Sequence, residues 1–223
     1  MQTARIREEL FDHTFVFLDG DILLQPGNGT TKTVEDPDDD MYGYFGDVTE
    51  VSQYQDLLEG LIDAVESLGP FDGIMGFSEG GIVGATLLLE DARRPFANFK
   101  CGIFFSAAPP LDPDALRDGI IGCLDPTADA AALSHVPTAH IYSHVKDTTG
   151  SGIANVQSPL HGLWVEAGWG TPEQLHGSLS RICGKSEVFV HDHGHRVPGS
   201  TDPQGLRGAL RAIDRTIKSA TGG

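Results

Sequence analysis

A serine flanked by glycines, set between an apolar segment and an apolar helix, constrains this chain most. The short segment Gly73–Gly76 is followed by Phe77-Ser78-Glu79-Gly80-Gly81, and apolar residues then continue to Leu89. Residues 76–80 fit the pattern Gly-X-Ser-X-Gly, in which the serine occupies a sharp strand-to-helix turn. This context predicts a nucleophilic serine at the carboxyl end of a sheet. The alternative is a glycine-rich helix start with an N-cap serine.

Short apolar segments alternate with helical periods along the rest of the chain. Besides the segment before Ser78, buried strands are expected at Thr14–Leu18, Cys101–Ser106, Thr138–Tyr142 and Glu187–Val190. Helices are expected at Ala4–Leu10, from Tyr54 to Leu68, from Gly80 to Leu89, and at the end of the chain through Leu206, Leu210, Ile213 and Ile217. Strands that are apolar on both faces indicate one α/β domain over residues 1–223, with a mainly parallel sheet flanked by helices.

Two stretches lack this regularity. Residues 21–50 contain Pro26-Gly27-Asn28-Gly29 and the acidic run Glu35–Asp40, and they predict a long irregular loop. The acidic run lacks the ligand spacing of a calcium loop, so we interpret it as a solvated loop. Together with Leu111–Ala132, the long loop is expected above the carboxyl ends of the strands, near the substrate pocket.

A serine nucleophile needs a base and an acid that orients it. His195 follows the last predicted strand and has a flexible glycine before it, so it is the expected base among nine histidines. Asp147 follows the strand at Thr138–Tyr142 and is the expected acid, although a solvated loop carboxylate is the alternative. The order Ser78, Asp147, His195 is that of an α/β hydrolase. The backbone N–H of Glu79 is the expected oxyanion donor.

The net charge and the composition of the chain limit the classes of partner that it can be expected to bind. The chain has 15 Lys and Arg against 32 Asp and Glu, a formal charge of -17, which disfavours nucleic acid and anionic membranes. The apolar run at Gly80–Leu89 is shorter than the roughly 20 residues of a membrane span, and the first residues contain no secretion signal, so a cytoplasmic protein is expected. The three cysteines lie far apart and are expected to be reduced core thiols.

The histidines before and at position 195 also allow a metal interpretation. His191, His193 and His195 alternate along one strand end, an arrangement that can converge on zinc. No spacing in the sequence identifies the remaining ligands. We therefore expect neither a metal nor another cofactor, and a metal hydrolase remains an alternative.

With these residues assembled, the chain resembles the α/β-hydrolase superfamily, and within it the small fungal serine hydrolases related to the lovastatin polyketide thioesterase. The resemblance covers nearly the whole chain and rests on residues 15–20, 76–81, 104–106 and 194–198. It implies that Ser78, Asp147 and His195 are catalytic. It also implies hydrolysis of an ester or thioester, with release of a polyketide acyl chain from a carrier domain as the expected role in secondary metabolism.

The chain departs from this family at its beginning. Members usually start with a strand that ends in a Leu-His-Gly type turn, and this chain starts inside the helix that follows. The missing strand normally lies in the middle of the sheet, and its turn supplies a second oxyanion donor. We therefore expect a sheet without the family's first strand, and Met1 as an internal methionine of a longer protein. A catalytically impaired acyl-binding relative and a general carboxylesterase of small substrates remain alternatives.

Overall fold

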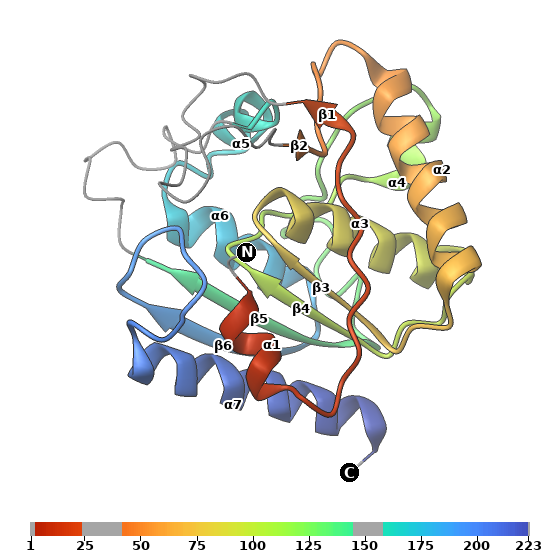
Figure 1. Cartoon of the computed structure of the whole chain (residues 1–223). Helices are drawn as coiled ribbons and strands as arrows, with labels where there is room; N and C mark the ends of the chain where they lie inside the picture. The colour runs from red at the N-terminus through yellow and green to blue at the C-terminus, as the bar shows by residue number, and fades with distance from the viewer. Residues whose placement is uncertain (1–2, 24–41, 145–157, 223) are drawn as a thin grey trace.

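The computed structural model describes residues 3–23, 42–144 and 158–222. Its centre is a parallel four-stranded sheet in the order β3-β4-β5-β6 (Figure 1). The strands are β3 (Gly73–Phe77), β4 (Cys101–Phe105), β5 (Pro137–Ser143) and β6 (Lys185–His191). Each coincides with an expected strand, so the predicted parallel α/β sheet is confirmed.

Helices cover both faces of this sheet (Figure 1). The described helices are α1 (Ala4–Glu9), α2 (Val51–Leu68), α3 (Glu79–Arg93), α4 (Pro113–Arg117), α5 (His161–Glu166), α6 (Pro172–Ile182) and α7 (Pro203–Thr221). The helices α7 and α1 lie on one face, and α3 and α6 lie on the other, with α2 packed outside α3. This layering is that of the α/β-hydrolase fold.

The two central strands carry the core. All residues of β4 and β5 are buried, because helices pack against both of their faces. Side chains alternate along β4, with Ile103 and Phe105 packing toward α7 and Phe104 packing toward α3 and α6. A strand that is covered by helices on both faces therefore needs apolar side chains at every position.

The edge strands are more exposed than expected. In β6, Val188 is 47% exposed and Val190 is 41% exposed, so this strand is not buried on both faces as predicted. At the other edge, β3 is buried only at Gly76. The apolar runs of β3 and β6 therefore predicted strands, but they did not show that these strands lie at the edges of the described sheet.

The prediction of a buried strand at Thr14–Leu18 is wrong. This segment is a coil between α1 and β1 (Ile22–Leu23), and Val16 and Phe17 are 50% and 47% exposed (Figure 1). No described strand lies beside it to pair with its N–H and C=O groups, so β-forming side chains alone do not make a strand there. Among the described residues, β3 is a terminal strand of the sheet.

The stretch 21–50 is not wholly irregular. Its two described ends form a short antiparallel pair between β1 and β2 (Tyr42–Gly43). The acidic run Glu35–Asp40 lies outside the described residues, and one domain over residues 1–223 stays a prediction.

No helix of the described part is both long and apolar enough to cross a bilayer. The cysteines at positions 101, 123 and 183 are unpaired thiols.

Candidate active site

The turn between β3 and α3 consists of a single residue. Ser78 has φ 54° and ψ −122°, a conformation outside the common regions for a residue with a Cβ atom, and it costs about 1–3 kcal/mol. Both sides of the turn hold it in place. Its N–H donates to the Phe105 carbonyl at 2.9 Å, and its carbonyl accepts from the Ile82 N–H at 3.1 Å. The strained turn therefore raises the serine side chain above the sheet.

Close packing explains the glycine before the serine. A Cβ atom at Gly76 would lie 2.2 Å from the carbonyl oxygen of Gly80, because the first turn of α3 passes directly over the end of β3. A Cβ atom at Gly81 would lie 2.6 Å from the Cβ atom of Ala107. The first glycine of the Gly-X-Ser-X-Gly pattern is therefore a steric requirement, whereas a Cβ atom at Gly80 would make only an ordinary contact of 3.4 Å with the Tyr44 ring. The structure gives the strand-turn-helix context that the sequence predicted.

The structure brings His195 to this serine. Its Nε2 atom lies 2.9 Å from Ser78 Oγ, within the range of proton transfer. The loop that carries it follows β6 and turns at Gly194, where φ is 66°. The Gly194 N–H donates to Ser143 Oγ at 3.2 Å, so the end of β5 holds the loop in place. A hydroxyl and an imidazole nitrogen in this arrangement can act as nucleophile and general base.

The expected acid cannot be placed. Asp147 falls in residues 145–157, which lie outside the described residues. Its role therefore stays a prediction.

A second histidine near the site was not found from the sequence. His176, on α6, is buried, and its ring stacks on the His195 ring with centroids 5.8 Å apart. Its Nδ1–H donates to the Ala107 carbonyl at 3.1 Å, and burial lowers the pKa of this imidazole to about 3. His176 is thus a neutral neighbour of His195. The apolar period of α6 places position 176 among buried residues, which is the signal that could have found it.

The other histidines of the 191–195 run have different partners. His193 Nε2 lies 3.1 Å from Asp202 Oδ2, and Asp202 also caps the first turn of α7 by accepting from the Gly205 N–H at 2.9 Å. His191 Nδ1 accepts from the His193 N–H at 3.2 Å. Within residues 3–23, 42–144 and 158–222, no three His, Cys, Asp or Glu side chains gather into a group that could hold an ion. The described residues therefore do not form the zinc arrangement considered from the sequence.

The strand beside β3 ends in the same manner. Phe77 and Phe105 are partners across β3 and β4, so Ser78 and Ser106 occupy equivalent positions at the carboxyl ends of the two strands. Ser106 also has a positive φ, 44°. Its buried hydroxyl has no hydrogen-bond partner among the described residues. Two adjacent strands thus end in strained serines, and only Ser78 has a histidine within reach in the described contacts.

Glu79 contributes to the site through both its main chain and its side chain. Its N–H lies in the first turn of α3, where amides have no partner within the helix and can meet an anion. Its partly buried carboxylate accepts from the Tyr44 N–H at 3.4 Å. Burial raises the pKa of this carboxyl group, and hydrogen bonds from the Tyr44 backbone, the Ser158 side chain and the Phe45 backbone oppose that rise.

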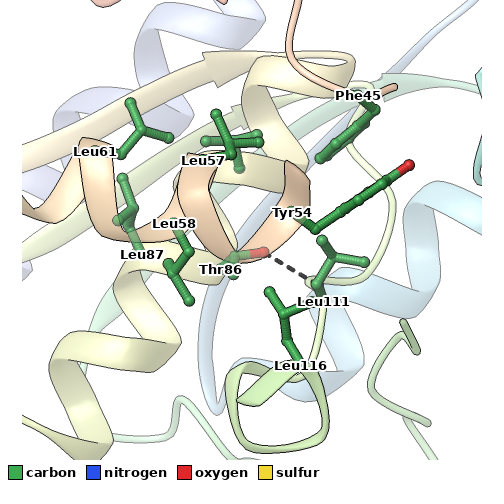
Figure 2. A pocket seen from close by; sticks show the side chains of 10 residues that line it. Phe45, Tyr54, Leu57, Leu58, Leu61, Thr86, Leu87, Leu111 and Leu116 are labelled. Atoms are coloured by element: carbon green, nitrogen blue, oxygen red, sulfur yellow. Dashed lines mark hydrogen bonds between the residues drawn. The ribbon is translucent and has the colours of Figure 1, made fainter. Parts of the chain in front are cut away.

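An apolar pocket lies between α2, α3 and α4 (Figure 2). Its lining is almost wholly hydrocarbon and consists of Phe45, Tyr54, Leu57, Leu58, Leu61, Val83, Thr86, Leu87, Leu111 and Leu116. The Thr86 hydroxyl donates to the Ile82 carbonyl at 2.9 Å and accepts from the Leu111 N–H at 3.0 Å, so its hydrogen bonds are satisfied within the protein. Phe45 and Leu111 come from the two stretches that the sequence places near a substrate pocket.

Known proteins similar to this chain share one chemistry in their names. The model of the family described as serine hydrolase (FSH1) matches residues 1–152. Esterase FPY3 of Fusarium mangiferae is 28% identical over 64% of this chain and 65% of its own length. Hydrolase phiM of Talaromyces stipitatus is 27% identical over 90% of this chain and 73% of its own length. Esterase alnB of Emericella nidulans is 30% identical over 92% of this chain and 86% of its own length. The chain thus spans less than two thirds of FPY3.

Proposed function

This chain belongs to the serine hydrolase (FSH1) family, and we propose that it hydrolyses an ester or thioester through an acyl-enzyme on Ser78. The observation that carries the proposal is the 2.9 Å distance between His195 Nε2 and Ser78 Oγ. A hydroxyl is a weak nucleophile at neutral pH, and an imidazole in hydrogen-bond contact is the group that activates it.

The proposed reaction has two steps, acylation of Ser78 and hydrolysis of the acyl-enzyme. His195 Nε2 takes the Ser78 proton as Oγ bonds to the substrate carbonyl carbon, and the carbonyl oxygen becomes an oxyanion. The oxyanion then collapses, the bond to the alcohol or thiol breaks, and His195 returns its proton to that leaving group. A water attacks the acyl-enzyme with His195 again as base. The acid departs, and the proton passes back to Ser78 Oγ.

Two further groups support these steps. The Glu79 N–H, at the positive end of α3, is the proposed donor to the oxyanion. Asp147 is proposed to accept from His195 Nδ1–H, which fixes the tautomer with a free lone pair on Nε2 and stabilises the imidazolium. Asp147→Asn is therefore expected to leave a small residual turnover.

For the substrate, we propose an acyl chain held as a thioester, with a polyketide on a carrier domain as the specific form. The resemblance to hydrolases related to the lovastatin polyketide thioesterase supports this choice. The test compares the hydrolysis rates of N-acetylcysteamine thioesters of long and short acyl chains with the hydrolysis rate of p-nitrophenyl acetate. Fast cleavage of the acetate ester alone would favour the alternative, a general carboxylesterase of small substrates.

One observation favours a second candidate, a catalytically impaired relative that binds an acyl ligand. Among the described residues β3 is a terminal strand, and within them the Glu79 N–H is the one oxyanion donor that we assign. Loss of one donor typically lowers turnover about a hundredfold to a thousandfold. Such a protein would keep its binding site and lose most of its rate.

A fluorophosphonate probe separates these candidates. An active serine hydrolase is labelled at Ser78, the label is lost in Ser78→Ala, and a chelator has no effect. Binding of an acyl ligand without labelling would support the impaired relative. Turnover that a chelator removes, without labelling, would support the metal hydrolase considered from the sequence.

A further inference from the structure

Two aromatic rings contact the imidazole of the proposed base. The centroid of the Phe77 ring lies 5.0 Å from that of the His195 ring, with 39° between the two ring planes. The centroid of the His176 ring lies 5.8 Å from that of His195, with 26° between the planes. Phe77 is the last residue of β3, and His176 lies on α6. The His195 ring therefore contacts two elements that are distant in sequence from its own loop.

These two rings reach His195 from opposite faces of the sheet. Phe77 packs against the cluster under α7, which contains Ile213. His176 belongs to α6, whose buried residues pack on the other face of the sheet with Phe104 (Figure 1). An imidazole that lies above the carboxyl end of the sheet is thus in contact with one ring from each layer.

Hydrogen bonds and ring contacts restrain different motions of an imidazole. A hydrogen bond at a ring nitrogen acts in the plane of the ring, as the 2.9 Å contact between His195 Nε2 and Ser78 Oγ does. The torsion that turns a histidine ring about its Cβ–Cγ bond is broad, so the ring can tilt unless its neighbours oppose the motion. Rings packed against it oppose that tilt. A displacement of about 1 Å in a reacting group can lower the rate about a hundredfold.

His176 is itself held in place. Its Nδ1–H donates to the Ala107 carbonyl at 3.1 Å, and its ring also lies against the Tyr142 ring, with centroids 6.0 Å apart. The helix that carries it begins with a capping box at Thr171. Burial lowers the pKa of His176 to about 3, so this ring stays neutral and does not repel the imidazolium that forms on His195 during the reaction.

We propose that His176 is a positioning residue that, together with Phe77, holds the His195 ring in the orientation in which Nε2 faces Ser78 Oγ. This inference rests on the proposed function, because His195 needs that orientation only if it takes the Ser78 proton. The effect of His176 reaches the reaction through the His195 ring. It therefore acts on proton transfer more than on substrate binding.

The test separates the ring of His176 from its hydrogen bond, with variants made in the full chain. His176→Asn keeps a donor for the Ala107 carbonyl and removes the ring, and it is expected to lower kcat about tenfold to a hundredfold while KM changes less than about threefold. His176→Phe removes the donor and keeps a flat ring, and it is expected to keep kcat within about threefold. His176→Leu removes both and is expected to lose as much kcat as His176→Asn. A merely structural role of the hydrogen bond would give the opposite order, with kcat retained only in His176→Asn.

Leu179→Ala is the matched control for lost packing on α6. Leu179 lies three residues after His176, is fully buried, and packs in the core with Phe104. The control is expected to lower the temperature of thermal unfolding while kcat per labelled active site is unchanged. Phe77→Leu removes the other ring, and it is expected to lower kcat as well. Its effect is expected to add less than fully to that of His176→Leu, because the two rings hold the same imidazole.

Labelling with a fluorophosphonate separates positioning from folding. The final labelled fraction of His176→Leu is expected to match that of the wild type, while its labelling rate falls with kcat. Because every kcat is expressed per labelled site, the comparison of His176→Phe with His176→Leu decides even if His176→Asn does not fold. The inference is wrong if His176→Leu keeps kcat within about twofold, or if His176→Phe loses as much kcat as His176→Leu. A wild type that is not labelled would instead overturn the proposed function, and this inference with it.

Discussion

His195 Nε2 lies 2.9 Å from Ser78 Oγ, although 117 residues separate the two in the chain. Their strands β3 and β6 are at opposite edges of the sheet, three strand spacings of about 4.8 Å apart. The loop after β6 must therefore cross back over the ends of β5 and β4 by roughly 14 Å to reach the serine. The hydrogen bond from Gly194 N–H to Ser143 Oγ holds it on that path.

We expect Ser78→Ala and His195→Ala each to lower kcat by at least about ten-thousandfold, because neither the nucleophile nor the base works without the other. Steady-state kinetics with an ester substrate measures this loss. The double variant is expected to be no worse than either single one. Unchanged thermal unfolding shows that the proteins remain folded, and turnover surviving in either single variant would contradict the assignment.

We expect His193→Ala to lower kcat/KM less than about tenfold. The His193 side chain contacts Asp202 at the start of α7 and not Ser78, so its removal affects only the support of the loop. The measurement is a direct comparison with His195→Ala on the same substrate. Equal losses in the two variants would mean that the base is wrongly assigned.

Much of the fold could be predicted because local and tertiary requirements agree. The run Cys101–Ser106 is apolar at every position, and β4 is buried at every position because helices cover both faces. Thr14–Leu18 looks similar in sequence, yet it forms no strand, since strand formation needs a neighbouring backbone to pair with. A sequence shows the side chains of a segment and not the strand beside it.

The residues of the candidate site also differ in whether the sequence alone could identify them. Ser78 could be found because the close packing of α3 over the end of β3 requires glycine at position 76, which together with Gly80 leaves a local pattern around the serine. His195 could be chosen only by its place after the last predicted strand and by the glycine before it. His176 and the Glu79 side chain were missed because their roles depend on contacts across the fold: His176 donates to the Ala107 carbonyl in the loop after β4, and Glu79 accepts from the Tyr44 N–H.

We expect Gly76→Ala to destabilise the protein by about 1–3 kcal/mol or more and to reduce activity. The new Cβ atom would lie 2.2 Å from the Gly80 carbonyl oxygen, so α3 must move away from β3 and take Ser78 with it. Gly60→Ala is the matched control. Gly60 lies inside α2, where a Cβ atom would meet no other atom within 4 Å, so alanine there is expected to stabilise by about 0.5–1 kcal/mol. Urea unfolding compares the two, and a stable, active Gly76→Ala protein would contradict the steric argument.

A buried carboxylate on the far part of α3 makes stability depend on pH. The Glu90 side chain is 3% exposed and receives hydrogen bonds from Arg94 at 2.7 Å and from Arg117 at 2.6 Å. Burial alone would raise the pKa of Glu90, but the two guanidinium groups outweigh it and hold the pKa at about 2, below the ordinary 4.5. The folded protein thus binds this proton less readily than the unfolded chain does.

We expect the ion pairs of Glu90 with Arg94 and Arg117 to stabilise the fold at neutral pH. This stabilisation is expected to be lost as the pH falls from about 4.5 to about 2. The folded-state pKa lies below the unfolded value, so the stabilisation is complete above 4.5 and disappears as Glu90 is protonated. It amounts to at most about 3 kcal/mol, and less because both arginine side chains are 43% exposed to solvent. Urea unfolding of the wild type and Glu90→Gln at pH 7, 4 and 3 measures the difference in free energy of unfolding. That difference is expected to be largest at pH 7 and to shrink steadily toward pH 3; a constant difference would show that Glu90 contributes through packing and not through its charge.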